Sequence, residues 1–305
     1  MSAEDRFIWL NGEIIHLNDA KINVLSPTAQ FGANVFEGIR CYWNEEYKKL
    51  YAFRLGDHYN RLKESIKIFR INAQYTKEEL LYALKEVIKK NDYKEDIAVR
   101  QTVFIDGFGT WSSKEPTGMF VAPVPKPRIV YTDDTGLRCG ISSWQRISDK
   151  NLSPRVKSGA NYINSRMAQL EAIEHGYDSA IFLNEQGKVS EGPGSCLFIY
   201  KSNKFITPPL TSSVLDSITR NTLIRLISEE LCMEVEERDI DRTELYVADE
   251  VFLCGSAMEI MPVKAIDGYV IGTGKYGSYT KKLHDKYLDV VTGKLCKYSM
   301  WIEEI

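Results

Sequence analysis

The sequence is poor in the features that mark several large classes of protein. Its six cysteines are spread over 305 residues without a CxxC pair, which argues against a disulfide-stapled scaffold. The four histidines show no ligand spacing with one another or with the cysteines, so no metal is expected. No apolar run approaches the roughly 20 residues that span a bilayer, and the N-terminus lacks the pattern of a signal peptide. We expect a cytoplasmic protein with reduced thiols.

An excess of charge of one sign is also missing. The 39 Lys and Arg residues nearly balance the 42 Asp and Glu residues, for a net charge of −3. That balance argues against nucleic acid or an anionic membrane as the main partner. The chain is longer than the roughly 250–300 residues at which one hydrophobic core stops growing, so two domains are expected.

Hydrophobic periodicity predicts helices mixed with short strands along the whole chain. Asn11-Gly12 joins two apolar runs and predicts a tight hairpin over residues 7–17, with a second hairpin over 38–55. Helices are expected over residues 57–69, 77–90, 161–176, 217–231 and 280–293. Strands are expected within residues 97–107, 118–123, 136–144, 179–183, 195–209 and 249–255. This mixture indicates an α+β fold.

A stretch with prolines at alternate positions interrupts this pattern at residues 122–128. Proline fixes its own backbone angle and restricts the residue before it, so Pro123, Pro125 and Pro127 predict neither helix nor central strand. We therefore expect a small N-terminal α/β domain over residues 1–122, an interdomain loop over 123–130 and a larger C-terminal domain over 131–305.

Lys157 differs from the other basic residues in its surroundings. Pro154 precedes it and the small residues 158–160 follow it, just before a predicted helix. Only the neutral amine of a lysine attacks a carbonyl, and burial favours the neutral form. By itself, however, such a pattern more often belongs to a surface lysine.

Three further segments change the interpretation of Lys157. Tyr162 follows five residues later, and Glu191 lies on the glycine-rich turn SEGPGS. Residues 217–220, SITR, open a helix whose N–H groups favour a phosphate, and CGSAME, residues 254–259, is a small-residue loop after a strand. A lysine, a phenol, an acid and phosphate-binding amides are together what pyridoxal phosphate requires.

These residues stand among the motifs FGANVFEGIR, DHYNRLKES, KSGANY, SEGPGS, ITR, VADEVFLCG and GSAMEIMPV. On these motifs the sequence resembles the fold-type IV pyridoxal-phosphate enzymes, most closely the bacterial branched-chain amino-acid aminotransferases. The resemblance covers nearly the whole chain. It implies a two-domain α+β fold like that of D-amino-acid aminotransferase, with the active site between the domains, and a homodimer or higher homo-oligomer. It also implies transfer of an amino group between glutamate, or another L-amino acid, and a 2-oxo acid of branched-chain or more specialised type.

The resemblance implies a role for each matched residue. Lys157 corresponds to the catalytic lysine that anchors the cofactor, Tyr162 to the partner of the cofactor's 3-oxygen, and Glu191 to the acid at its ring nitrogen. The phosphate and ring contacts that it implies are Arg61, Leu215, Ile218, Thr219 and Ser256. The substrate-binding residues that it implies are Phe31, Phe36, Gly38, Ala98, Arg100 and Ala257.

The substrate side departs from the family pattern. Phe31 and Ala98 stand where tyrosine is common, and Lys126 and Arg128 stand where the interdomain loop usually offers aromatic residues. Arg100 matches the arginine that helps to bind the distal carboxylate of glutamate. We therefore expect glutamate as donor, modest efficiency on branched-chain 2-oxo acids and a preference for a bulkier or more acidic one.

Three other readings stay open at this point. A 4-amino-4-deoxychorismate lyase and an (R)-amine or D-amino-acid transaminase share the same fold. Arg100 and the EGIR and GSAMEI segments favour a transaminase over the lyase. A non-enzymatic protein that has kept the fold is the third reading, and the combination of Lys157, Tyr162, Glu191 and Arg61 argues against it.

Overall fold

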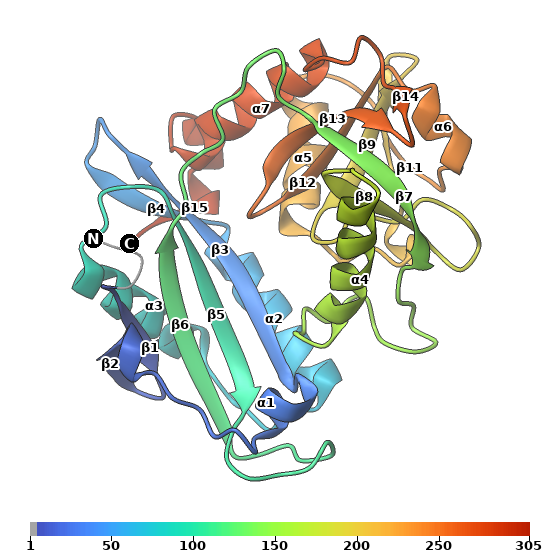
Figure 1. Ribbon diagram of the computed structural model, residues 1–305. Helices are drawn as coiled ribbons and strands as arrows, with labels where there is room; N and C mark the ends of the chain where they lie inside the picture. Colours follow the sequence, from blue (N-terminus) through green and yellow to red (C-terminus); the bar gives the residue numbers. More distant parts are fainter. Residues whose placement is uncertain (1–4) are drawn as a thin grey trace. The chain divides into compact units, whose positions relative to one another are not determined.

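The computed structural model describes residues 5–305, which form two compact units (Figure 1). Unit 1 contains the chain up to Arg128, the short segment Val156–Ala160 and the segment Asp289–Ile305. Unit 2 contains Ile129–Arg155 and Asn161–Leu288. Each unit has its own β-sheet and its own helices.

Unit 1 is built on a seven-stranded sheet with the order β15-β4-β3-β5-β6-β1-β2. Its strands are β1 (Phe7–Leu10), β2 (Glu13–His16), β3 (Asn34–Asn44), β4 (Lys49–Phe53), β5 (Ile97–Ile105), β6 (Thr117–Pro125) and β15 (Ile302–Glu304). Its helices are α1 (Pro27–Phe31), α2 (Leu55–Phe69), α3 (Lys77–Asn91) and the 3₁₀ turns η1 (Leu17–Asp19) and η3 (Cys296–Trp301).

Helices α2 and α3 cover one face of this sheet (Figure 1). Odd-numbered strand residues such as Val35, Ile39 and Val103 are completely buried in the core between the sheet and these helices. Burial of such side chains removes apolar surface from water and stabilises the unit by about 25 cal/mol per Å². Because side chains alternate along a strand, the even-numbered residues of β3 and β5 lie on the opposite face.

Unit 2 is built on a second sheet with the order β11-β10-β9-β12-β13-β7-β8, and β14 pairs with β13. Its strands are β7 (Leu137–Gln145), β8 (Ser179–Leu183), β9 (Cys196–Lys201), β10 (Lys204–Thr207), β11 (Val235–Glu237), β12 (Glu250–Gly255), β13 (Glu259–Ile266) and β14 (Tyr269–Val270). Its helices are α4 (Asn161–Glu174), α5 (Ile218–Glu230), α6 (Arg242–Tyr246) and the turn η2 (Leu210–Ser212). Helix α7 (Ser278–Val291) starts in this unit and ends in unit 1. Helix α4 packs on β7 and β8, and α5 packs on β12.

The local predictions are confirmed where the sequence pattern is strong. Asn11 and Gly12 have φ values of 51° and 103° and form the expected hairpin turn between β1 and β2. The five helices expected from periodicity are α2, α3, α4, α5 and α7, with ends within a few residues of those predicted. Ser217 caps the start of α5, where its side chain accepts a hydrogen bond from the N–H of Arg220.

The first part of the proline stretch forms a strand, whereas the sequence pattern predicted a loop from residue 123. Strand β6 continues through Pro123 and Pro125, which pair with Val99 and Ile97 of β5. Strand β1 pairs with β6 only at Phe120 and Val121, so both prolines lie where the other side of β6 has no paired strand. Because alternate residues direct their N–H groups to the same side, prolines at these positions remove donors only from that unpaired side.

Unit 1 also contains two segments that were expected in the C-terminal domain over residues 131–305. Strand β15 pairs with β4, with Ile302 opposite Phe53, so the segment from Asp289 belongs to unit 1. The segment Val156–Ala160 belongs to unit 1 as well, because it hydrogen-bonds to β3. Pairing between strands that are distant in sequence leaves no local signal, and the sequence pattern could not reveal it.

Candidate active site

Lys157 lies in the segment of the chain that hydrogen-bonds to β3. The N–H of Phe36 donates to the carbonyl of Lys157 at 2.9 Å, and the N–H of Lys157 donates to Ser65 Oγ on α2 at 3.3 Å. A β-bridge joins Val35 to Ser158 directly beside it. The backbone that carries Lys157 is therefore held by both a strand and a helix of unit 1.

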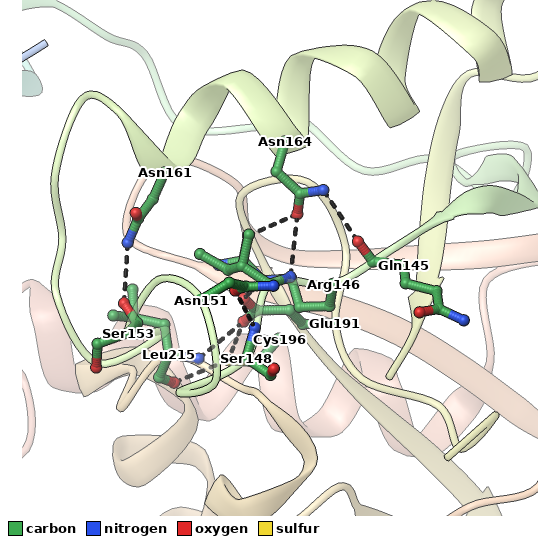
Figure 2. Close-up of polar contacts among 11 residues, drawn as sticks. Gln145, Arg146, Ser148, Asn151, Ser153, Asn161, Asn164, Glu191, Cys196 and Leu215 are labelled. Carbon is green, nitrogen blue, oxygen red and sulfur yellow. Dashed lines mark hydrogen bonds and ion pairs between the residues drawn. The ribbon is translucent and has the colours of Figure 1, made fainter. Parts of the chain in front are cut away.

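The small residues around Lys157 are required by close packing. A Cβ atom at Gly159 would lie 2.8 Å from Asn34 Oδ1, because this glycine sits directly against β3. The base of the loop is closed in unit 2, where Asn161 Nδ2 donates to the carbonyl of Ser153 at 3.0 Å (Figure 2). The small-residue loop around Lys157 is therefore held by close packing against β3 and by the hydrogen bond at its base.

The ring of Phe36 contacts two cationic side chains. The guanidinium carbon of Arg100 lies 3.8 Å from the ring centroid, and Lys157 Nζ lies 5.0 Å from it. Arg100 reaches Phe36 because both residues lie on the face of the sheet that α2 and α3 leave uncovered, with Gly38 opposite Arg100. An aromatic face attracts cations, so this ring favours both positions.

Arg61 on α2 belongs to a buried network with Glu37 and His58. Arg61 Nε and Nη2 donate to Glu37 Oε1 and Oε2 at 2.8 and 2.6 Å, and His58 Nδ1 lies 2.7 Å from Glu37 Oε2. Burial raises the pKa of Glu37, but the Arg61 charge and the hydrogen bonds outweigh it and bring the pKa to about 2. Burial lowers the pKa of His58. We call these three residues the Glu37 network.

Glu191 is the centre of a group in unit 2 that we call the Glu191 cluster (Arg146, Glu191, Cys196 and Leu215; Figure 2). Arg146 Nε donates to Glu191 Oε1 at 2.8 Å, and the N–H of Leu215 donates to Oε2 at 3.2 Å. Cys196 Sγ lies 3.8 Å from Glu191 Oε2 and from the Leu215 carbonyl. The carboxyl group is only 5% exposed and is fixed in one orientation.

Arg146 is itself held by α4. Asn164 Oδ1 accepts a hydrogen bond from Arg146 Nη1 at 3.3 Å, while Asn164 Nδ2 donates to the carbonyl of Gln145 at 3.0 Å (Figure 2). The side chain of Arg146 is 8% exposed. The chain of contacts from α4 through Arg146 to Glu191 therefore gives this carboxylate a rigid support.

The N-terminus of α5 offers a buried donor. Thr219 is 2% exposed, and within residues 5–305 its main-chain N–H has no acceptor. Such orphan amides, together with the helix dipole, make the start of a 13-residue helix suited to an anion such as phosphate. Ile218 is the first residue of the same helix. The structure thus contains a donor of the kind that a phosphorylated cofactor requires.

The other expected site residues lie at the ends of elements. Tyr162 is in the first turn of α4, and Phe31 is the last residue of α1, half-exposed, with its ring 6.2 Å from that of Trp111. Ser256 and Ala257 form the turn between β12 and β13, closed by a bond from the N–H of Met258 to the carbonyl of Gly255. Phe31 therefore belongs to unit 1, whereas Tyr162 and the turn belong to unit 2.

The expected substrate residues on β5 have a neighbour that the sequence did not single out. Ala98 pairs with Arg40 of β3, a side chain only 2% exposed that donates to the carbonyl of Lys126 at 2.6 Å. Arg128 donates to Asp96 Oδ1 at 2.8 Å and to the carbonyl of Trp43 at 2.6 Å. The charge of Arg128 is therefore paired with that of Asp96 within unit 1.

Across residues 5–305, no group of three or more His, Cys, Asp or Glu side chains is arranged to hold a metal ion. None of the helices in that range has the length and apolar character needed to cross a membrane.

Comparison with known proteins decides the family. Residues 34–266 match the family model described as amino-transferase class IV. The chain belongs to the class IV aminotransferase family. A relative from Aquifex aeolicus, described as a probable branched-chain-amino-acid aminotransferase, is 39% identical over 98% of this chain and 96% of its own length. The branched-chain-amino-acid aminotransferase of Escherichia coli K12 is 36% identical over 98% of this chain and 97% of its own.

Solved structures agree with this assignment to the class IV aminotransferases. The branched-chain amino acid aminotransferase of Thermobaculum terrenum, solved in a form with pyridoxal phosphate, has a TM-score of 0.94 and 40% identity, with 99% of both chains covered. The branched-chain aminotransferase of the archaeon Thermoproteus uzoniensis, solved with norvaline, has a TM-score of 0.91 and 39% identity, with 98% of this chain and 99% of its own covered. The expected fold-type IV architecture and the expected enzyme class, an aminotransferase, are confirmed.

Sequence reasoning missed the residues that support the expected site. Glu37 and His58 stand inside the quoted motifs FGANVFEGIR and DHYNRLKES, and an acidic residue next to apolar residues in a predicted strand was a signal that could have found Glu37. Arg146 and Asn164 lie in no such motif, and only the folded structure brings them to Glu191.

Proposed function

We propose that this class IV aminotransferase uses pyridoxal phosphate to exchange amino groups between glutamate and branched-chain 2-oxo acids. The observation that carries the proposal is the Phe36 ring, which contacts both a lysine amine and an arginine guanidinium. Lys157 is a base and anchor, and Arg100 is a cation that suits the distal carboxylate of glutamate. An amine and a carboxylate-binding group on one aromatic residue match what a glutamate transaminase must provide.

The residues of this chain suit the parts of the cofactor. Arg61, the N–H of Thr219 and the hydroxyl of Ser256 would hold the phosphate, with Ile218 beside them at the start of α5. Glu191 would accept a hydrogen bond from the protonated ring nitrogen, and the phenol of Tyr162 would bind the 3-oxygen. Leu215 would contact the ring. When bound, pyridoxal phosphate supplies an electron-withdrawing ring that stabilises negative charge at the substrate's α-carbon.

Each protein group then has one task. The amine of Lys157 would remove the proton from the α-carbon of the donor and, in the second half of the reaction, would donate a proton to the α-carbon of the new amino acid. The carboxylate of Glu191 would accept the hydrogen bond of the ring nitrogen, which requires a side chain that is held in one orientation. The salt bridge to Arg146 supplies that restraint.

Lys157 provides the test of the whole proposal. Borohydride reduction of the purified yellow holoenzyme, followed by peptide mapping, should place the cofactor on Lys157 and on no other lysine. The Lys157→Ala variant should lose transamination by about 10²–10⁴-fold, the usual contribution of a general base, and should take up no label. A label on a different lysine would show that Lys157 is a structural residue.

Substrate choice should depend on Arg100 and Ala98. Replacing Arg100 with Gln removes a hydrogen bond to a charged group, so we expect KM for glutamate to rise by about 10-fold or more. With leucine as donor, which has no distal carboxylate, KM should change little. Ala98 has a small side chain where the family commonly has tyrosine, and we expect bulkier 2-oxo acids to be accepted beside the branched-chain ones. A panel of 2-oxo acids read by amino-acid analysis measures both expectations.

We further propose that the enzyme is a cytoplasmic homodimer. Four apolar residues of α4 are 37–61% exposed at helical spacing: Ile163, Met167, Leu170 and Ile173. A contiguous apolar stripe of this kind supports association with a protein surface. The six cysteines are free thiols, as expected for a reducing compartment. Light scattering should give a mass of twice 34.9 kDa for the holoenzyme, and a single-chain mass would contradict the dimer.

A further inference from the structure

The Glu37 network contains a carboxylate with no contact to solvent. Glu37 is completely buried, and His58 and Arg61 are 1% and 8% exposed. Its two oxygens accept three hydrogen bonds, two from the Arg61 guanidinium and one from His58 Nδ1. A side chain buried in this way has no direct route to a substrate, so its function must act through the residues that it contacts.

The position of Glu37 follows from the alternation of strand β3. Phe36, the residue before it, lies on the uncovered face of the sheet and binds the Lys157 backbone. Glu37 therefore points to the opposite face, where α2 presents His58 and Arg61 one turn apart. Strand β3 thus connects the lysine on one side with the arginine on the other.

We propose that Glu37 and His58 are positioning residues that fix the orientation of the Arg61 guanidinium for the phosphate of the cofactor. This inference rests on the phosphate role of Arg61 stated under the proposed function. Arg61 uses Nε and Nη2 to hold Glu37 in a two-point fork, a geometry that fixes the plane of the guanidinium group. His58, neutral because of burial, donates its Nδ1 proton to Glu37 and holds the carboxylate in turn.

Charge and orientation predict opposite effects at Glu37. If only net charge mattered, removing the Glu37 negative charge beside Arg61 would strengthen binding of a phosphate dianion. If orientation matters, any change that breaks the fork weakens that binding, whatever the charge. Glu37→Gln removes the charge, whereas Glu37→Asp keeps the charge but shortens the side chain by one methylene group. The orientation model predicts that both variants bind the phosphate less tightly.

The experiment compares two cofactors that differ only in the phosphate. Apo-protein prepared from each purified holoenzyme is titrated with pyridoxal phosphate and, separately, with pyridoxal. We expect Glu37→Gln and Glu37→Asp to weaken pyridoxal phosphate by about 10-fold or more, with affinity for pyridoxal unchanged. His58→Gln should weaken pyridoxal phosphate by roughly 3-fold, because it removes a support one step further away. Glu64→Gln, an exposed position on α2, is the matched control and should bind like the wild type.

The outcomes separate the possible failures. Tighter or unchanged binding of pyridoxal phosphate by both Glu37 variants would overturn the positioning role. An equal loss for pyridoxal phosphate and pyridoxal would also overturn it, because damage to the fold in general does not depend on the phosphate. Arg61→Met is measured in parallel. If Arg61→Met binds pyridoxal phosphate normally, the phosphate role of Arg61 fails first, and the role of Glu37 fails with it.

Discussion

The two units each bury an arginine–carboxylate pair, and the proposed function uses the two pairs in opposite ways. In the Glu37 network the carboxylate is completely buried and accepts bonds from Arg61 and His58, and we propose that the arginine is the partner that acts on a ligand. In the Glu191 cluster the arginine is bonded to Asn164 as well as to Glu191, and we propose that the carboxylate is the partner that acts. A salt bridge alone therefore does not indicate which partner acts on a ligand. The further contacts of each partner, such as His58 with Glu37 and Asn164 with Arg146, are also needed.

The largest effect should come from Glu191, the carboxylate of unit 2 that we propose acts on the cofactor. Glu191→Gln keeps the size of the side chain but cannot hold a ring nitrogen protonated, so we expect kcat to fall on the order of 10²-fold or more. The absorbance of bound cofactor should be retained, because the phosphate contacts are unchanged. Glu185→Gln, in the nearby turn, is the control. Normal turnover of the Glu191 variant would mean that the two pairs do not differ in the way described.

A smaller effect should follow from the support of that carboxylate. Arg146→Met leaves the Leu215 N–H on Glu191 but removes the Arg146 bond, and we expect a kcat loss of about 10-fold with KM for the 2-oxo acid unchanged. Breaking one partner of a buried pair also costs about 3–5 kcal/mol of stability, so the melting temperature should fall. Arg146→Lys should recover part of the rate, whereas Arg166→Met, exposed on α4, should change neither quantity. If the Arg146→Met variant loses stability but keeps full turnover, Arg146 has a structural role only.

The smallest effect concerns the response of unit 1 to acid. Burial lowers the pKa of His58, and the charges of Arg61 and Lys157 lower it further. The hydrogen bond and the charge of Glu37 raise this pKa, but the net shift is downward. Unfolding therefore takes up a proton, so the contribution of His58 to stability is complete above about pH 6.5 and is lost as pH falls below that value. The pKa of Glu37 is also lowered, and its contribution is lost between its ordinary value of 4.5 and about pH 2.

Replacement of His58 isolates the first of these two steps. In urea unfolding at a series of pH values, His58→Gln should reduce the decline in stability just below about pH 6.5 and keep the decline that begins near the ordinary pKa of Glu37. The part of the first decline that remains is expected from His284, whose pKa is also lowered by burial. An unchanged first decline in the variant would assign that step to another group.

The sequence revealed the parts of this molecule that depend on local pattern. The apolar spacing of α2 and α4, the Asn11-Gly12 turn and the small residues after Lys157 were all readable, because each is determined by a few neighbouring residues. The recognised motifs also contain Arg61 and Glu191. Whether these residues have the roles that the family resemblance implies stays a prediction.

The supports of these residues could not be predicted in the same way. Arg146 reaches Glu191 across 45 positions of sequence, and β15 reaches β4 from the far end of the chain, so neither contact leaves a periodic signal. The prolines of β6 were misread because their effect depends on which side of the strand is paired, a property of the sheet and not of the stretch itself.

The segment Val156–Ala160 limits how this protein can be recombined. It belongs to unit 1, although the residues on both sides of it belong to unit 2. A crossover between two homologous genes at the boundary near Arg128 would join one parent's β3 to the other parent's Lys157 loop. The hydrogen bond from Phe36 to Lys157 and the contact of Gly159 with Asn34 would then have to form between sequences that were never selected together. A working chimaera must therefore carry β3 and residues 156–160 from the same parent.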